Sequence, residues 1–272
     1  MSEAPRGASR SAMLVAACRL LAAELPPDQR LIEDPFASLV CDEEAIAHAR
    51  ADEPLQLVIR MRTKYIDDAV LAFCAEHPGA QVLLLGAGYD ARPYRLALSA
   101  TFYEVDFPAT LELREAVYAP VAVATPRVAV PVDLANEPFD APLIAAGFDP
   151  HVPTIVVWEG VINYLTAEAA EAVVHALGSF LSSGSTVIAD YVEMNFFRDT
   201  QFERTATDLK QRLVQGGERL RGGLPDALGS LDRAGFDVID DEAAELLPPR
   251  YGLPLAPRCY AGRLFTAVRR TD

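Results

Sequence analysis

Two glycines and an aspartate in the first half of the 272-residue chain have the types and spacing of a nucleotide-binding site. Gly86 and Gly88 follow an apolar run, where glycine permits a sharp turn and close approach of a ligand to the backbone. Twenty residues after Gly86, Asp106 ends the segment FYEVD, where a carboxylate can accept hydrogen bonds from both ribose hydroxyls. We therefore expect Gly86, Gly88 and Asp106 to bind a nucleoside-like ligand.

Such a turn serves two classes of cofactor, dinucleotides and S-adenosylmethionine, which differ in whether a pyrophosphate must sit at the start of the following helix. Asp90 stands in the turn, where its carboxylate would repel a pyrophosphate, and Ala91 replaces the third glycine of dinucleotide-binding turns. Both departures favour S-adenosylmethionine over NAD. Two alternatives stay open: an NAD(P)-binding oxidoreductase, and a binding module without catalytic activity, which Ala91 and Pro93 would mark as a decayed site.

The elements that position these residues follow from the hydrophobic pattern. QVLLLG, which begins at Gln81, is a short continuous apolar run, typical of a strand buried on both faces. Strands alternate along the chain with segments rich in helix-forming residues, at Ala109–Ala119 and Ala167–Leu181, which predicts an α/β doubly wound sheet. The further strands are expected at Thr101–Val105, Val128–Val132, Thr154–Trp158, Ser185–Tyr191, Phe236–Asp240 and Arg263–Val268.

The length of the chain allows one sizeable core with added segments. We expect residues 1–77 to form a helical N-terminal cap and residues 78–272 to form the sheet domain. Within that domain, residues 193–222 are polar with a helix-like middle, and we expect them to form an inserted lid. Three phenylalanines among its charges, Phe196, Phe197 and Phe202, would let the lid close over an apolar substrate.

Composition excludes several classes of partner. With 24 Lys and Arg against 39 Asp and Glu, the net charge of −15 argues against nucleic acid and against an anionic membrane surface. The four cysteines form no CxxC pair and the four histidines no ligand spacing, so we expect free thiols and no metal. Arg19 interrupts the apolar run Ala12–Ala23, so neither a signal peptide nor a membrane span is expected there. We expect a cytoplasmic protein; its oligomeric state is open.

Five segments follow one another along the chain: RMRTKYIDD, LLLGAGYDARPYRL, FYEVDFP, VDL and IVVWEGVINYL. They resemble, in the same order, the motif series of the leucine carboxyl methyltransferase family, and the resemblance runs from about Ala12 to Arg269. It implies a Rossmann-like class I methyltransferase fold, with a seven-stranded, mostly parallel sheet and one antiparallel strand near the C-terminus. It also implies S-adenosyl-L-methionine as the cofactor.

The resemblance further implies methylation of a small acceptor. Bacterial branches of the family, similar in length to this chain, methylate small natural products, including polyketide-derived carboxyl groups. We therefore expect O-methylation of a carboxyl or hydroxyl group of a small molecule. Methylation of a protein's C-terminal carboxylate, which the family also carries out, is the alternative.

By the same resemblance, Arg62 would pair with the methionine carboxylate, Gly86 would contact the methionine part and Asp106 would hold the ribose. Arg62 has no carboxylate at its helical i±3 and i±4 positions, so we expect it to be free for an external anion. Asp133 and Leu134 would contact adenine, although an aspartate at this place could equally open a turn.

Glu159 matches the family's cofactor-side glutamate, and Tyr164 matches an aromatic residue near the reacting centre, where it is our catalytic candidate. The family pattern has threonine after the aspartate of the glycine turn, and Ala91 stands there in this chain. The sequence identifies no dedicated general base, which favours an acceptor that is already ionised, such as a carboxylate. Its cationic partner is expected among Arg198, Arg204, Arg250 and Arg258.

Overall fold

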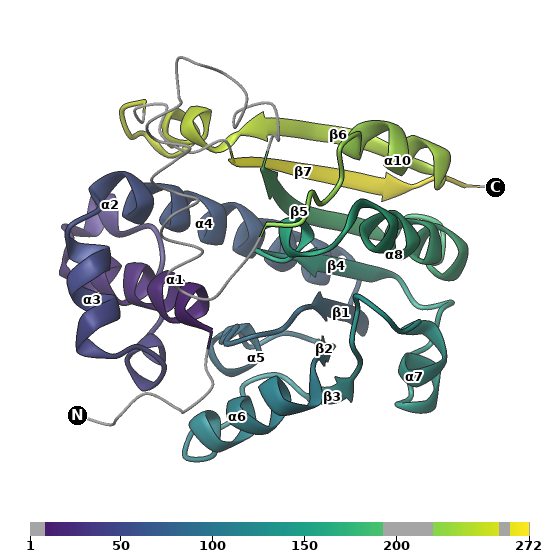
Figure 1. The fold of residues 1–272 in the computed structure, drawn as a ribbon, viewed down its shortest axis with the longest axis horizontal. Helices are drawn as coiled ribbons and strands as arrows, with labels where there is room; N and C mark the ends of the chain where they lie inside the picture. Colours follow the sequence, from purple (N-terminus) through teal and green to yellow (C-terminus); the bar gives the residue numbers. More distant parts are fainter. Residues whose placement is uncertain (1–8, 193–219, 256–261, 272) are drawn as a thin grey trace.

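The computed structural model describes residues 9–192, 220–255 and 262–271, and its described part contains one seven-stranded sheet (Figure 1). Most of the expected lid, residues 193–219, lies outside the described residues. The strands are β1 Ala80–Leu85, β2 Ala100–Asp106, β3 Arg127–Pro131, β4 Thr154–Trp158, β5 Thr186–Val192, β6 Phe236–Ala243 and β7 Gly262–Arg269.

The order of the strands is β3-β2-β1-β4-β5-β7-β6. The first five pair in parallel, while β7 runs antiparallel to both of its neighbours, β5 and β6. This confirms the predicted fold, including the single antiparallel strand. The order reverses at β1, since β2 and β3 lie on one side of it and β4 and β5 on the other, and ligands of open α/β sheets bind at such a point.

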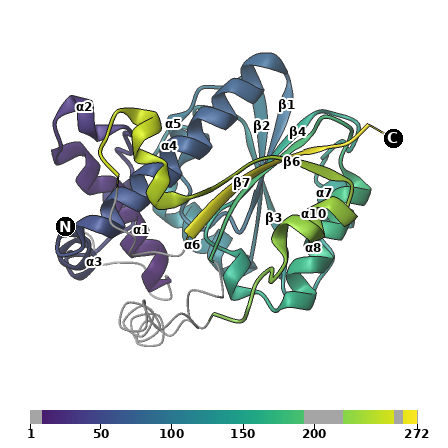
Figure 2. The ribbon, with the colours of Figure 1, turned by 90° about the horizontal axis from the view of Figure 1, so that it is seen from above.

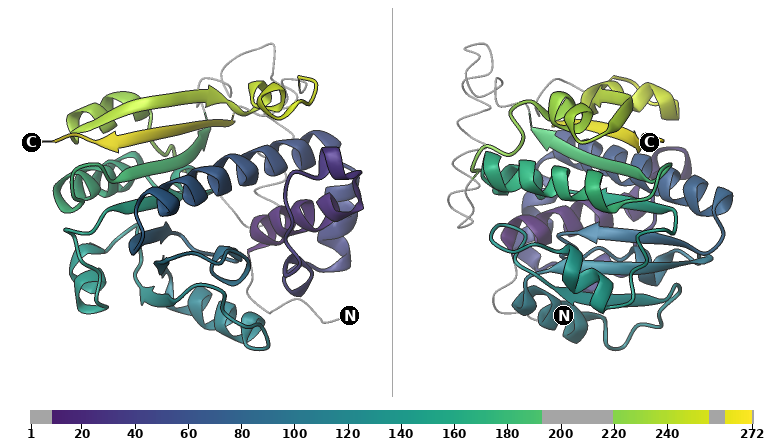
Figure 3. Two further views of the ribbon diagram at one scale, coloured as in Figure 1. Left: turned by 180° about the vertical axis from the view of Figure 1, so that it is seen from behind. Right: turned by 90° about the vertical axis from the view of Figure 1, so that its right-hand side faces the viewer.

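The central strands are mostly apolar because helices cover both faces of the sheet (Figures 2 and 3). Every residue of β1 and β4 is buried. Leu83 and Leu85 pack on one face with residues of α8 (Ala167–Phe180), whereas Val82 and Leu84 pack on the other with residues of α4 (Glu53–Glu76). Two smaller helices, α7 (Asp140–Ala145) and α10 (Ala227–Arg233), complete the α8 side.

Polar caps fix where the longer helices begin. The hydroxyl of Thr166 accepts a hydrogen bond from the backbone N–H of Ala169 at the start of α8. The carboxylate of Asp52 caps α4 in the same way, and Pro54 occupies its first turn, where no backbone donor is needed. From this capped start, α4 packs residues between Val58 and Cys74 against the sheet, while Ile59 packs with the N-terminal helices.

Preceding α4, the chain forms α1 (Arg10–Leu21), α2 (Pro27–Arg30) and α3 (Glu43–Arg50). Small residues let α1 and α3 approach closely, and their shared core also takes in tyrosines from the segments that follow β1 and β2, namely Tyr89, Tyr94 and Tyr118. These tyrosines belong to the glycine turn, α5 (Arg92–Arg95) and α6 (Pro108–Tyr118). The N-terminal helices therefore pack directly beside the ligand-binding edge of the sheet.

The two edge strands differ from the central ones. In β6, a register shift between Val238 and Asp240 leaves the side chain of Ile239 66% exposed. At the other edge, β3 has only five residues and ends at Pro131. Among the described helices, none has both the length and the apolar character needed to cross a membrane.

Candidate functional site

A pocket of about 1040 Å³ opens at the carboxyl ends of β1, β2 and β4. The glycine turn forms its floor, and residues of α1 and α4 line its sides. The residues that the sequence predicts to contact the cofactor or the reacting centre all line this pocket: Arg62, Gly86, Gly88, Asp106, Asp133, Leu134, Glu159 and Tyr164. The structure thus brings together residues that lie up to about a hundred positions apart in the chain.

The glycine turn needs glycine for two separate reasons. Gly86 and Gly88 have φ angles of +73° and +46°, a region that side-chain-bearing residues rarely adopt. A Cβ atom added at Gly86 would lie 2.3 Å from Cγ2 of Val161, which follows β4. The turn is therefore pressed against the segment after β4, and its backbone lies open to a ligand in the pocket.

The Asp106 carboxylate points toward the glycine turn. One oxygen accepts a hydrogen bond from the backbone N–H of Gly88 at 2.7 Å, and the other accepts one from the N–H of Phe107, also at 2.7 Å. Burial raises the pKa of Asp106, although the two N–H donors oppose this. These donors fix the carboxylate in place, and because its two oxygens offer about four acceptor sites, it can still bind a hydroxyl group.

Phe107 is a pocket residue that sequence reasoning missed. Its side chain is 50% exposed although it is large and apolar, and it lines the pocket beside Asp106. An exposed aromatic ring next to a fixed carboxylate offers a flat apolar surface to a ligand. The signal was present, because phenylalanine directly follows the aspartate in FYEVDFP.

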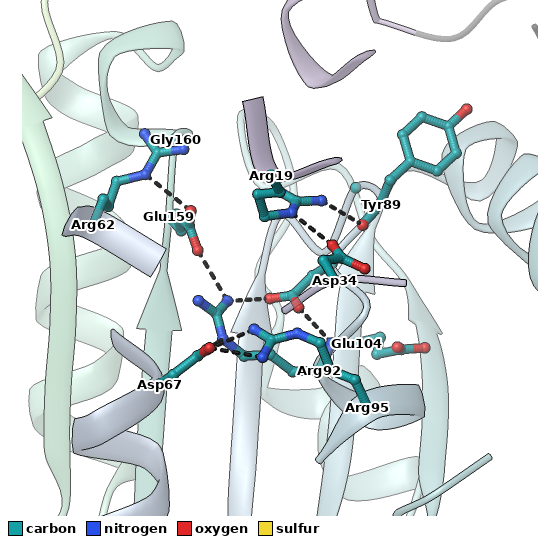
Figure 4. A network of polar contacts seen from close by, with 12 residues as sticks. Arg19, Asp34, Arg62, Asp67, Tyr89, Arg92, Arg95, Glu104, Glu159 and Gly160 are labelled. Atoms are coloured by element: carbon teal, nitrogen blue, oxygen red, sulfur yellow. Dashed lines mark hydrogen bonds and ion pairs between the residues drawn. The ribbon is translucent and has the colours of Figure 1, made fainter. Parts of the chain in front are cut away.

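Arg62 is not free for an external anion, contrary to expectation. Its Nε lies 2.9 Å from Oε1 of Glu159 (Figure 4). Its Nη1 lies 2.8 Å from Oδ2 of Asp190. The prediction considered only partners on the same helix, whereas these two carboxylates come from the ends of β4 and β5. A ligand carboxylate at Arg62 would thus join an existing ion-pair cluster.

Glu159 lies between two guanidinium groups. Besides Arg62, it accepts from Nη1 of Arg92 at 2.9 Å, and its side chain is 14% exposed. Burial alone would raise the pKa of Glu159, but Arg62, Arg92 and Arg19 outweigh it and lower the pKa to about 2. Glu159 is therefore a carboxylate at neutral pH and does not act as a proton acceptor there.

Arg92, at 2% exposure, is the centre of this cluster (Figure 4). It pairs with Asp67 of α4 at 2.7 Å and with Asp90 in the glycine turn, in addition to Glu159. Asp90 also accepts from the Arg92 backbone N–H at 2.8 Å. Sequence reasoning missed Arg92 because its partners lie on three separate elements.

The pairing of Asp90 corrects one step of the sequence argument. Its carboxylate is neutralised by Arg92, so its repulsion of a pyrophosphate is weaker than expected. The helix that follows the turn, α5, has only four residues and presents no extended helix dipole to a pyrophosphate. The preference for S-adenosylmethionine over a dinucleotide therefore rests on Ala91 in place of a third glycine and on the shortness of α5.

A buried ion pair supports the glycine turn from behind. Arg114 of α6 pairs with Glu104 of β2, and both side chains are fully buried. Arg114 also donates to the carbonyl oxygen of Gly88 at 3.0 Å and to that of Asp90. These bonds hold two carbonyl groups of the turn while the Gly88 N–H faces Asp106.

Asp133 opens a turn after β3, as the alternative interpretation had it. Its two carboxylate oxygens accept from the N–H of Ala135 at 2.9 Å and from the side-chain amide of Asn136 at 2.7 Å. The carboxylate still lines the pocket together with Leu134, so a turn and an adenine contact are compatible. The adenine contact stays a prediction.

Tyr164 lies in the short 3-10 helix η3 (Ile162–Tyr164) that follows β4, and it lines the pocket. Of the cations expected to face an acceptor, Arg250 is bound to Asp240 through two contacts of 2.7 and 3.1 Å and does not line the pocket. Arg198, Arg204 and Arg258, like Phe196, Phe197 and Phe202, fall outside the described residues. Arg221, which the sequence did not suggest, lines the pocket instead.

No cluster of three or more His, Cys, Asp or Glu side chains suited to a metal ion occurs among the described residues. Cys18, Cys41 and Cys74 are buried free thiols. The polar side chains that line the pocket carry carboxylates, guanidinium groups, hydroxyls and, at Asn136, an amide.

Comparison with known proteins gives the family. The family model of leucine carboxyl methyltransferases matches residues 12–178. A Frankia alni protein named "Putative S-adenosyl-L-methionine-dependent methyltransferase" is 31% identical over 98% of this chain and 96% of its own length. A Mycobacterium avium protein with the same name is 33% identical over 67% of this chain and 66% of its own, so that alignment spans just under two thirds of the relative.

The fold is shared more widely. A solved structure from Thermobifida fusca, also named a putative methyltransferase, aligns with a TM-score of 0.58 at 16% identity, covering 87% of this chain and 93% of that one. At this identity the likeness concerns the fold alone. The match to the family model and the identity to the Frankia alni relative over nearly its full length show that the chain belongs to the leucine carboxyl methyltransferase family of S-adenosylmethionine-dependent methyltransferases.

Proposed function

We propose that this protein is an O-methyltransferase that transfers the methyl group of S-adenosylmethionine to a carboxyl or hydroxyl oxygen of a small natural product. The observation that carries the proposal is the pairing of a fixed Asp106 with the glycine turn, across the pocket from the cluster of Arg62 and Glu159. One end of the pocket thus suits a ribose, and the other suits a charged amino-acid group.

The described residues fit this cofactor. Asp106 retains acceptor sites for ribose hydroxyls, and Arg62 would bind the methionine carboxylate while Glu159 balances the charge. Gly160 lies beside the Arg62 guanidinium, since a Cβ atom added there would lie 3.9 Å from both of its terminal nitrogens. Ligand pockets typically measure roughly 300–1,000 Å³. At about 1040 Å³, this one has room for a cofactor and a small acceptor.

The bound cofactor supplies an electrophilic methyl group on a sulfonium, and the protein must align the acceptor oxygen and exclude water. No histidine is among the described residues that line the pocket, and Glu159 is held ionised by its arginines. An acceptor that arrives as a carboxylate needs no proton removed, whereas a phenol with a pKa of about 10 does. The site therefore favours carboxyl methylation.

Isothermal titration with S-adenosylhomocysteine tests the cofactor assignment. We expect the wild type to bind it and Asp106→Ala to lose detectable binding, because the ribose hydroxyls would lose their acceptor. Thermal unfolding of the variant checks that it is folded. Undiminished binding by folded Asp106→Ala would contradict the assignment.

The reaction itself is tested by mass spectrometry of small-molecule extracts incubated with methyl-labelled cofactor. We expect label in an ester or ether, and label appearing on nitrogen or carbon would contradict O-methylation. The same assay on Tyr164→Phe tests the role of Tyr164. We expect this variant to change turnover and to leave the binding of S-adenosylhomocysteine unchanged, because Tyr164 follows β4 whereas Asp106 and Asp133 lie at the ends of β2 and β3.

A further inference from the structure

Among the described residues that line the pocket, one arginine side chain has no carboxylate partner. Five arginines line it among the described residues, and four of them have a carboxylate partner. Arg19 pairs with Asp34 at 2.8 Å, and Arg95 pairs with Asp67 at 2.7 Å. Arg62 and Arg92 belong to the Glu159 cluster described above. For Arg221, no side-chain hydrogen bond or ion pair occurs within the described part of the chain.

The backbone of Arg221 is nevertheless held in place. Its N–H donates to the carbonyl oxygen of Asn163 at 2.8 Å, and the N–H of Gly223 donates to that of Leu165 at 3.1 Å. Gly223 has a φ of +57°, and an added Cβ there would lie 3.0 Å from Oδ1 of Asn163. The segment is therefore packed against η3, beside Tyr164, while the guanidinium remains exposed.

The position of Arg221 separates it from the nucleoside end of the pocket. Asp106 and Asp133, which follow β2 and β3, carry negative charge at that end, and neither has an arginine ion pair among the described residues. An anion would be repelled there and attracted toward Arg221, on the segment that packs against η3. Because the backbone of Arg221 is anchored and its guanidinium has no partner among the described residues, it can bind an anion with little loss of main-chain freedom.

We propose that Arg221 binds an anionic group of the methyl acceptor and so selects carboxylate acceptors over neutral ones. The proposal rests on the methyltransferase function proposed above. In the transfer, one carboxylate oxygen forms a bond to the methyl carbon as the bond from that carbon to sulfur breaks, and no proton moves. The product ester is neutral, so it loses its attraction to Arg221, which favours release of product over retention.

Fluorine NMR on protein saturated with S-adenosylhomocysteine tests this proposal with two probes of matched shape. These are 4-fluorobenzoate, which is an anion, and 4-fluorobenzamide, which is neutral. We expect the wild type to bind the benzoate about tenfold or more tightly than the benzamide, as a charge-assisted hydrogen bond provides. Arg221→Gln should lose this preference, and Arg221→Lys should keep part of it because the charge remains.

Arg250→Gln is the matched control, since Arg250 is an exposed arginine that is paired with Asp240 outside the pocket. It should retain the wild-type preference for benzoate. Equal or absent binding of the two probes to the wild type would overturn the proposal, as would an unchanged preference in Arg221→Gln. All variants should bind S-adenosylhomocysteine as the wild type does, and failure of the wild type to bind it would refute the proposed function instead.

Discussion

Replacement of Glu159 by glutamine isolates the electrostatic role of the arginine cluster. The amide keeps the size of the side chain but removes the negative charge that faces Arg62 and Arg92, each 2.9 Å away. Both arginines retain other carboxylates, namely Asp190 for Arg62, and Asp67 and Asp90 for Arg92. The fold should therefore persist with lower stability, because a buried ion pair loses one member.

The size of the effect follows from the pKa of Glu159, which falls from 4.5 to about 2 in the folded protein. At about 1.4 kcal/mol for each tenfold change in the ionisation equilibrium, the fold favours the ionised carboxylate by about 3 kcal/mol. We expect Glu159→Gln to lower the free energy of unfolding by about that amount at pH 7. The wild type has this stabilisation in full above pH 4.5 and loses it as the pH falls toward 2, so the two proteins should converge in that window.

Urea unfolding followed by circular dichroism, at pH 7 and at steps below pH 4.5, measures both expectations. Glu112→Gln, which changes an exposed glutamate on α6, is the control and should alter the free energy of unfolding by less than about 0.5 kcal/mol. Two results would contradict stabilisation of the fold by the ionised Glu159 among its arginines. One is a free energy of unfolding for Glu159→Gln within about 1 kcal/mol of the wild-type value at pH 7, and the other is a difference that does not become smaller in acid.

Two further predictions concern the glycine turn and Asp106. Gly86→Ala should lower the free energy of unfolding by about 2–4 kcal/mol, and Gly184→Ala should lower it by about 1 kcal/mol. Both glycines have a positive φ, but only a Cβ atom at Gly86 would collide with Val161. Urea unfolding measures both, and equal costs would refute the steric reasoning. Binding of S-adenosylhomocysteine should weaken as the pH falls through the raised pKa of Asp106, since the ionised form accepts the ribose hydroxyls. Titration from pH 7 downward tests this, and constant affinity to pH 4 would contradict it.

The fold was predictable because its signals are local. β1 and β4 are buried on both faces, so they appear in the sequence as continuous apolar runs, and their bounds match the prediction to within one residue. The capping hydroxyl of Thr166 likewise acts on its own helix. The N-terminal helices were predicted only as a helical region, because their individual ends depend on how α1 and α3 pack together.

The candidate site was predictable to the same extent. Residues that follow a strand directly, such as Gly86, Asp106 and Glu159, are placed by that strand, and all three line the pocket. The ion pairs were not predictable, because Arg62 meets carboxylates 97 and 128 residues further along the chain. A sequence shows which side chains carry charge, but their pairing is set by the order of strands in the sheet.

The irregular ends of the sheet bear on how copies of this protein meet. An edge strand exposes unpaired backbone donors and acceptors to which a strand of another chain can add. Here the bulge at Ile239 interrupts β6, which also carries Asp237, Asp240, Asp241 and Glu242, while Pro131 removes a donor from β3. These features disfavour pairing of either edge strand, β6 or β3, with a strand of another molecule. They therefore reduce aggregation through edge strands at high protein concentration.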